Sequence, residues 1–137
     1  MNNINQKTPE GWSVKKLGEC FKLSSGDAKP NDTASKGKYP VYGGNGILGY
    51  SETYNFSDDN IIIGRVGEYC GCIHRFNGKC WITDNALYIK DKLLKYSNNF
   101  MFYFFIIKNY FFLSDEDFAK YVLDGKMLEA NDMAIAC

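Results

Sequence analysis

A short segment rich in glycine and tyrosine, residues 38–50, constrains the fold of this chain more than any other stretch. It reads KYPVYGGNGILGY and holds four glycines and three tyrosines. Glycine accepts positive φ angles and close backbone approach, so residues 43–46 are predicted to form a tight loop. Asn45 brings the one side-chain amide of that loop, a group that both donates and accepts hydrogen bonds. A glycine cluster is typical of a structural hairpin as well as of a recognition loop, and both interpretations remain open here.

Several short strands are predicted after this loop. Residues 61–63 are three consecutive isoleucines, a β-branched run that favours a buried strand. Asn77 and Gly78 lie between two apolar runs, which predicts a hairpin turn. Residues 83–85 form a polar corner before a further strand at residues 86–89. This pattern indicates a twisted, mostly antiparallel, barrel-like sheet.

Helical character begins near residue 97. Ser97, Asn98 and Asn99 are suitable N-caps, and residues 100–113 are apolar nearly all round, which predicts a helix buried on most faces. A second helix is predicted from residue 114 to about residue 125, and residues 126–137 show no clear pattern. The expected fold class is therefore α+β, with the sheet followed by C-terminal helices.

The charge of the chain is balanced overall but uneven along its length. Lys and Arg total 16, as do Asp and Glu, so no global field draws the chain to nucleic acid or membrane. Residues 1–113 carry 14 basic and 10 acidic side chains, whereas residues 114–137 carry 2 and 6. We predict a folded domain over residues 1–113, mildly basic and able to offer a phosphate-contacting face, and an acidic helix and tail over residues 114–137.

The number of cysteines and the length of the apolar runs indicate the part of the cell in which the protein is expected. Five cysteines are an odd number, and the polar N-terminus lacks the apolar core of an export signal, which favours a reducing cytoplasm. The most apolar run, residues 100–113, is interrupted by Lys108 and Asn109 and falls short of the roughly 20 residues that span a bilayer. We expect a cytoplasmic protein without membrane association.

Metal binding and catalysis are not favoured by the sequence. Cys70, Cys72, His74 and Cys80 form a conceivable zinc set. On a strand, however, residues 70 and 74 would lie roughly 13 Å apart, too far for one ion unless Gly71 bends the chain. His74 is the one histidine, and the sequence has no Walker loop and no hydrolase motif. Gly44, Gly46 and Gly49 have the GxGxxG spacing of a dinucleotide site but not its flanking strand and helix. We therefore expect no metal, no cofactor and no enzymatic activity.

Four ordered stretches together resemble a known family. They are PEGW with KLG at residues 9–18, YPVYGGNGI with GY at residues 39–50, IIIGRVG with Gly71, and WITDNAL at residues 81–87. In this order they resemble the target recognition domain of the specificity (S) subunit of type I restriction–modification systems, over about residues 9–113.

The resemblance implies a non-catalytic, cytoplasmic module that binds double-stranded DNA and gives target specificity to a methyltransferase (M) and a restriction (R) subunit. The S-adenosylmethionine chemistry would belong to the methyltransferase, and a second specificity half-subunit is a further implied partner. After residue 113 the chain departs from the family pattern, with no recognisable spacer helix or second recognition domain. The alternative is a protein-interaction or regulatory remnant that assembles with a methyltransferase without reading DNA.

Candidate DNA contacts follow from side-chain chemistry. Base readout uses amide and guanidinium groups, and phosphates attract lysine and arginine. Arg65, next to Gly64 at the end of a buried strand, is shaped for a bidentate contact, although a salt bridge to Asp58 or Asp59 or a bond to nearby carbonyls would also explain it. Residues 24–36 and 53–59 are alternative base-reading loops, because recognition domains must vary where they read sequence. The predicted DNA-contacting residues are Asn45, Arg65, Tyr42, Lys36, Lys38, Arg75, Lys79 and Asn85.

Overall fold

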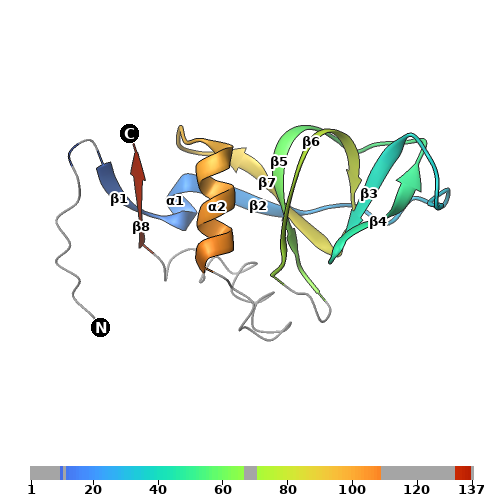
Figure 1. Ribbon diagram of the computed structural model, residues 1–137, viewed down its shortest axis with the longest axis horizontal. Coiled ribbons are helices and arrows are strands. Elements are labelled where there is room, and N and C mark those ends of the chain that lie inside the picture. Colours follow the sequence, from blue (N-terminus) through green and yellow to red (C-terminus); the bar gives the residue numbers. More distant parts are fainter. Residues whose placement is uncertain (1–9, 11, 67–70, 109–131, 137) are drawn as a thin grey trace.

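The computed structural model describes residue 10 and residues 12–66, 71–108 and 132–136 (Figure 1). The predicted second helix, residues 114–125, lies outside the described residues. In chain order the elements are β1 (Trp12–Lys16), α1 (Leu17–Cys20), β2 (Phe21–Ser25), β3 (Tyr39–Gly43), β4 (Gly46–Ser51), β5 (Phe56–Gly64), β6 (Ile73–Ile82), β7 (Ala86–Lys92), α2 (Asn98–Lys108) and β8 (Asp132–Ala136).

Six strands form the main sheet in the order β2-β7-β5-β6-β3-β4. Each neighbouring pair is antiparallel except β3 and β6, which run parallel. The predicted α+β class and mostly antiparallel sheet are confirmed. The sheet does not close into a barrel, since β2 and β4 end its strand order. One helix, α2, follows the sheet in the described part of the chain.

The predicted hairpin turn at Asn77 and Gly78 is wrong. Both residues lie inside β6, which pairs with β5 over residues 73–80 and continues beside β3 at residues 81–82. Gly78 has a φ of +137° and faces Asp58, whose φ is +130°. The positive φ angles therefore accompany a local distortion of the paired strands β5 and β6, which curve in Figure 1. The chain does not reverse its direction at Gly78.

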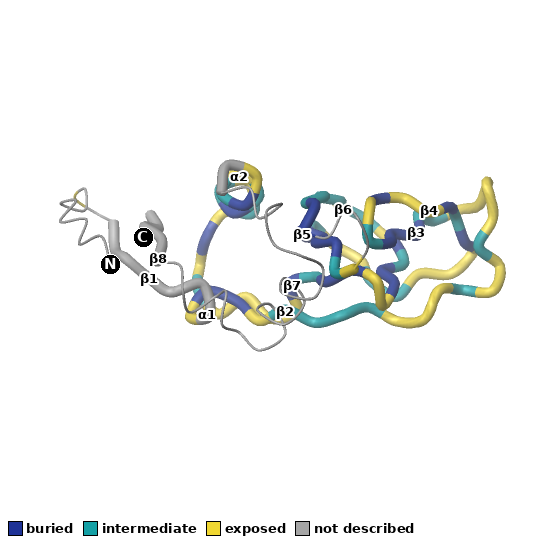
Figure 2. The backbone as a smooth tube through the Cα atoms, turned by 90° about the horizontal axis from the view of Figure 1, so that it is seen from below, coloured by how far each residue is buried: buried dark blue, intermediate teal, exposed yellow. Residues whose placement is uncertain are grey.

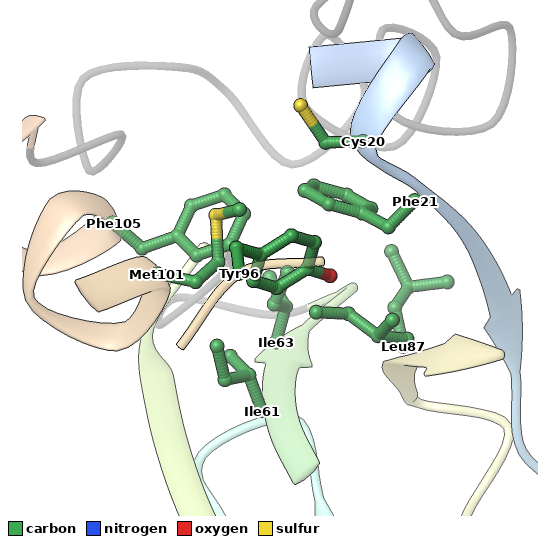
Figure 3. Close-up of a cluster of buried hydrophobic side chains, with 9 residues drawn as sticks. Cys20, Phe21, Ile61, Ile63, Leu87, Tyr96, Met101 and Phe105 are labelled. Carbon is green, nitrogen blue, oxygen red and sulfur yellow. The ribbon is translucent and has the colours of Figure 1, made fainter. Parts of the chain in front are cut away.

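The three isoleucines of β5 supply two separate cores because successive side chains of a strand point to opposite faces. Ile61 and Ile63 belong to a cluster with Phe21, Leu87, Met101 and Phe105, drawn in Figure 3. Ile62 joins a second cluster with Tyr42, Cys80, Ile82 and Ala86. A continuous apolar run is what a strand covered on both faces requires.

Helix α2 begins where the capping residues predicted it, at Asn98, with the Met101 amide donating to the Ser97 carbonyl at 3.1 Å. Met101 and Phe105 are buried against the sheet, but Tyr103 is 61% and Ile106 45% exposed. Phe100, Phe102 and Phe104 are half-buried and pack against the same core. Over its described part the helix is therefore largely covered but exposes Tyr103 and Ile106, and residues 109–113 lie outside the described residues.

A second, two-stranded sheet joins residues far apart in sequence. Strand β1 pairs antiparallel with β8, with Trp12 opposite Ala136 (Figure 1). β8 lies in residues 126–137, for which the sequence had shown no clear pattern.

Candidate nucleic-acid interface

The glycine-rich segment forms the β3–β4 hairpin, with Asn45 exposed at its turn. Gly46 follows with a φ of +94°, a conformation that glycine adopts readily. At Gly44, a Cβ atom would lie 2.8 Å from the Val66 carbonyl oxygen and 3.4 Å from that of Asn85. The turn therefore packs directly against the backbone that follows β5 and the backbone that precedes β7.

Arg65 follows β5 directly and is half-buried. Its backbone amide donates to the Asn85 carbonyl at 3.0 Å, and its Nη1 donates to the Asp84 carbonyl at 3.2 Å. Of the alternatives weighed from the sequence, the bond to nearby carbonyls is the one observed. These two bonds hold the backbone and the guanidinium group of Arg65 against the corner between β6 and β7.

Three predicted base-reading residues thus come together from three separate segments. Asn45 lies at the hairpin turn, Arg65 at the end of β5, and Asn85 at the corner before β7. Gly44, which precedes Asn45 in the turn, packs against the carbonyl groups of Val66 and Asn85, which belong to the other two segments. We call Asn45, Arg65 and Asn85 the hairpin-tip cluster.

Lysines and tyrosines gather at the opposite end of the same hairpin. The Lys38 ammonium lies 5.3 Å from the Tyr39 ring centroid, and the Lys79 ammonium lies 4.8 Å from that of Tyr54. The two tyrosine rings pack edge to face with centroids 5.0 Å apart. We call Lys38, Tyr39, Tyr54 and Lys79 the lysine–tyrosine cluster; it combines two cations with stacking surfaces.

The two loops kept as alternatives in the sequence analysis meet near this cluster. The Asn55 amide of the second loop donates to Asp27 of the first at 2.8 Å, and the hydroxyl of Ser51, the last residue of β4, donates to Asp32 of the first loop at 2.7 Å. The Ser51 hydroxyl, followed by the Glu52 backbone amide, holds the pKa of Asp32 below its usual value. Lys36 is exposed in the first of these loops, and Figure 2 shows a largely exposed surface at this end of the molecule.

The two clusters are separated by the length of the hairpin. Tyr39 and Gly43 are the first and last residues of β3. At roughly 3.3 Å per residue, the strand places the clusters about 13 Å apart along its direction.

Two of the predicted DNA-contacting residues, Tyr42 and Arg75, are engaged in contacts within the fold. Tyr42 is only 5% exposed and packs its ring against Phe76 at 5.6 Å, in the second core. Burial also raises the pKa of its hydroxyl. Arg75 is engaged with Asp59 through bonds of 2.8 and 2.6 Å and also donates to Asn99. Both residues therefore serve the fold, Tyr42 by packing and Arg75 by an ion pair.

The histidine and one cysteine lie beneath the hairpin turn. The Cys72 sulfur is 3.1 Å from the Gly44 carbonyl oxygen and 3.2 Å from His74 Nε2. Burial raises the pKa of the Cys72 thiol and lowers that of His74, so neutral forms of both are favoured at neutral pH. In the described part of the chain, no three His, Cys, Asp or Glu residues are placed to hold a metal ion, and Cys70 lies outside it.

Tyr54 belongs to an exposed cluster that was not predicted from the sequence. Tyr54 is 44% exposed and follows β4, whereas its cation partner Lys79 is on β6. An aromatic residue in a polar stretch was the available signal. Its pairing with lysine depended on strand neighbours that sequence spacing does not reveal.

Comparison with known proteins identifies the fold and the family. Residues 9–122 match the family described as "Type I restriction modification DNA specificity domain". Over 80 residues the chain is 32% identical to the type I restriction enzyme EcoprrI specificity subunit of Escherichia coli, covering 55% of this chain and 20% of that protein.

No helix among the described residues has the length and apolar character needed to cross a membrane.

Two solved structures share the fold. The type I restriction–modification S subunit from M. genitalium superposes with a TM-score of 0.60 at 18% identity, covering 92% of this chain and 34% of the other. The HsdS subunit from Thermoanaerobacter tengcongensis gives 0.58 at 14% identity, covering 98% and 35%. The chain thus spans about a fifth of its curated relative and about a third of these two structures. With the family match covering most of its length, this chain belongs to the type I restriction modification DNA specificity domain family.

Proposed function

We propose that this chain is a sequence-specific DNA-binding module that gives target specificity to a type I methyltransferase and restriction complex and is itself non-catalytic. The observation that carries the proposal is the meeting of Asn45, Arg65 and Asn85 at one end of the sheet, in a chain of this family. Amide and guanidinium groups are those that read base edges in the major groove.

The two clusters suit different parts of a duplex. The hairpin-tip cluster would contact bases, while Lys36 and the lysine–tyrosine cluster would contact phosphates. Base edges at the floor of the major groove lie about 8.5 Å below its rim and half of its width of about 12 Å from either backbone, so a separation of about 13 Å along β3 lets one hairpin reach from base edges to a flanking phosphate. The partners would be double-stranded DNA, the M and R subunits and a second specificity half-subunit.

Selection from randomised duplexes tests this proposal. The chain, alone and in the presence of a type I methyltransferase subunit, is expected to enrich one short sequence, with an affinity that falls steeply as salt rises. Asn45→Ala and Arg65→Lys should relax the enriched sequence, each by about 1–3 kcal/mol of discrimination at one base pair. Asn77→Ala is the matched control, because Asn77 is an exposed asparagine on β6, outside both clusters. Enrichment of no sequence under either condition would refute the proposal.

A second function is favoured by one observation on α2. Tyr103 and Ile106 lie three residues apart on the helix and are both exposed. An exposed apolar helix face is typical of a protein contact, which fits a remnant that assembles with a methyltransferase without reading DNA. Co-purification with the methyltransferase, combined with no crosslinking of the chain to DNA, would select this function over the first.

A further inference from the structure

We propose that Cys72 and His74 are positioning residues that hold the β3–β4 turn in place, so that Asn45 presents its amide to DNA in one fixed orientation. The inference rests on the proposed function and adds a specificity-determining pair that contacts no DNA itself. His74 is the second residue of β6 and pairs with Ile62 of β5, while Cys72 directly precedes β6 and its carbonyl accepts from the Gly64 amide at 2.9 Å, so backbone pairing with β5 holds both residues in place.

The first step is the contact between thiol and turn. The Cys72 sulfur donates to the Gly44 carbonyl at 3.1 Å and lies 3.8 Å from Asn45 Oδ1. A thiol has one proton, so a bond to Gly44 leaves the sulfur to accept from His74 Nε2, 3.2 Å away. This chain of bonds runs from His74 through Cys72 to the turn and requires the Nε2-protonated tautomer of His74.

The second step is the packing of the imidazole under the turn. A Cβ atom at Gly46 would lie 3.1 Å from His74 Cε1, so the ring fills the space beneath the residue that follows Asn45. The His74 ring also packs at 6.4 Å from the Tyr42 ring in the second core. The turn is therefore supported from below by a side chain that is itself anchored in the core.

The third step is the orientation of Asn45. Its Oδ1 lies 3.8 Å from the buried Cys72 sulfur, within donor distance of the same thiol that bonds to Gly44, while the residue as a whole is exposed. The amide NH₂ group is then the part left for a ligand, and it is a pure donor. In the major groove such a group selects acceptors, namely purine N7, guanine O6 or thymine O4.

The chain provides a matched control for removing this sulfur. Cys80 is on β6, the strand that Cys72 precedes, and is buried in the second core, where it belongs to the cluster with Tyr42 and Ile82. Cys72→Ala and Cys80→Ala each remove one buried sulfur, so both are expected to destabilise the fold. Only Cys72→Ala removes the bond to the turn. Cys72→Ser keeps a donor at that position.

Two readouts decide the inference. Hydrogen–deuterium exchange of the peptide covering residues 43–49 is expected to be faster in Cys72→Ala than in Cys80→Ala, with Cys72→Ser between them. In duplex selection, Cys72→Ala should lose about tenfold of its discrimination at the single base pair that Asn45→Ala also relaxes. Cys80→Ala should keep the wild-type preference.

The possible results separate the two proposals. Equal exchange in Cys72→Ala and Cys80→Ala would overturn the positioning role. Faster exchange with unchanged selectivity would also overturn it and would leave the proposed function standing. A wild-type chain without sequence preference would remove the proposed function and the recognition part of this inference together, while the exchange comparison would still decide whether the pair holds the turn.

Discussion

Replacing Asp59 by Asn tests how the helix is fastened to the sheet. Asp59 on β5 accepts from Arg75 Nε at 2.8 Å and from Arg75 Nη2 at 2.6 Å. The Asn98 amide, at the start of α2, donates to the Asp59 carboxylate and to its backbone carbonyl, both at 3.2 Å. One carboxylate thus links two strands to the first turn of the helix.

The magnitude follows from geometry and exposure. The side chains of Arg75 and Asp59 are 28% and 27% exposed, so the pair is neither fully solvated nor buried. Exposed pairs contribute about 0.2–1 kcal/mol and hydrogen bonds to charged groups about 1.5–3 kcal/mol. We expect Asp59→Asn to lower the free energy of unfolding by about 1–2 kcal/mol at pH 7, between these limits.

The pH dependence provides a sharper check. The Arg75 guanidinium, aided by Asn98, holds the pKa of Asp59 below its usual value. A carboxyl group with a lowered pKa in the folded state stabilises the fold above its unfolded pKa of about 3.9, and this stabilisation is lost as the pH falls through the folded value. The difference between wild type and Asp59→Asn should therefore be complete at pH 7 and shrink below about pH 4.

Urea unfolding at pH 7 and near pH 3 measures both effects, and a thermal scan should show a loss of roughly 3–8 °C at neutral pH. Asp91→Asn is the control, because Asp91 is an exposed carboxylate on β7 and the change should have little effect there. An Asp59→Asn protein as stable as wild type at pH 7, or a difference that persists undiminished at pH 3, would refute the reasoning.

Three further changes have expected outcomes. Asn60→Ala should cost about 2–3 kcal/mol in urea unfolding, because the buried Asn60 amide donates to the Ile89 carbonyl at 2.8 Å and accepts from the Ile89 amide at 3.1 Å, groups that would lose their partner. Asp58→Gly should raise the unfolding free energy by about 1 kcal/mol, since its φ of +130° strains any side chain; a loss of stability would argue against strain at this position. Lys38→Ala with Lys79→Ala should weaken DNA binding about equally on all sequences and lower the salt slope by about 2, whereas an altered base preference would contradict a phosphate role.

Much of the fold could be predicted because some patterns act over a few residues. The three isoleucines at residues 61–63 predict a buried strand, and Asn98 predicts a helix start, since β-branching and capping are local properties. Asn45 and Arg65 could also be nominated from side-chain chemistry and neighbouring glycines. The family resemblance came from ordered short motifs, which the match over residues 9–122 confirms.

Tertiary structure alone decided the points that depend on strand neighbours. Asn77 and Gly78 have the composition of a hairpin turn, but pairing with β5 on one side and β3 on the other keeps β6 continuous. Tyr42 and Arg75 carry the chemistry of a binding site, and only packing shows that the first is in the core and the second is tied to Asp59.

Sequence by itself therefore determined several strands, the start of α2 and which side chains have the chemistry to contact bases and phosphates. The tertiary structure decided which of those groups remain at the surface and which come together, such as Asn45 with Arg65 at one end of the hairpin and Lys38 with Tyr54 and Lys79 at the other. The physical reason is that capping and β-propensity depend on adjacent residues, whereas burial and ion pairing depend on side chains brought together by the register of distant strands.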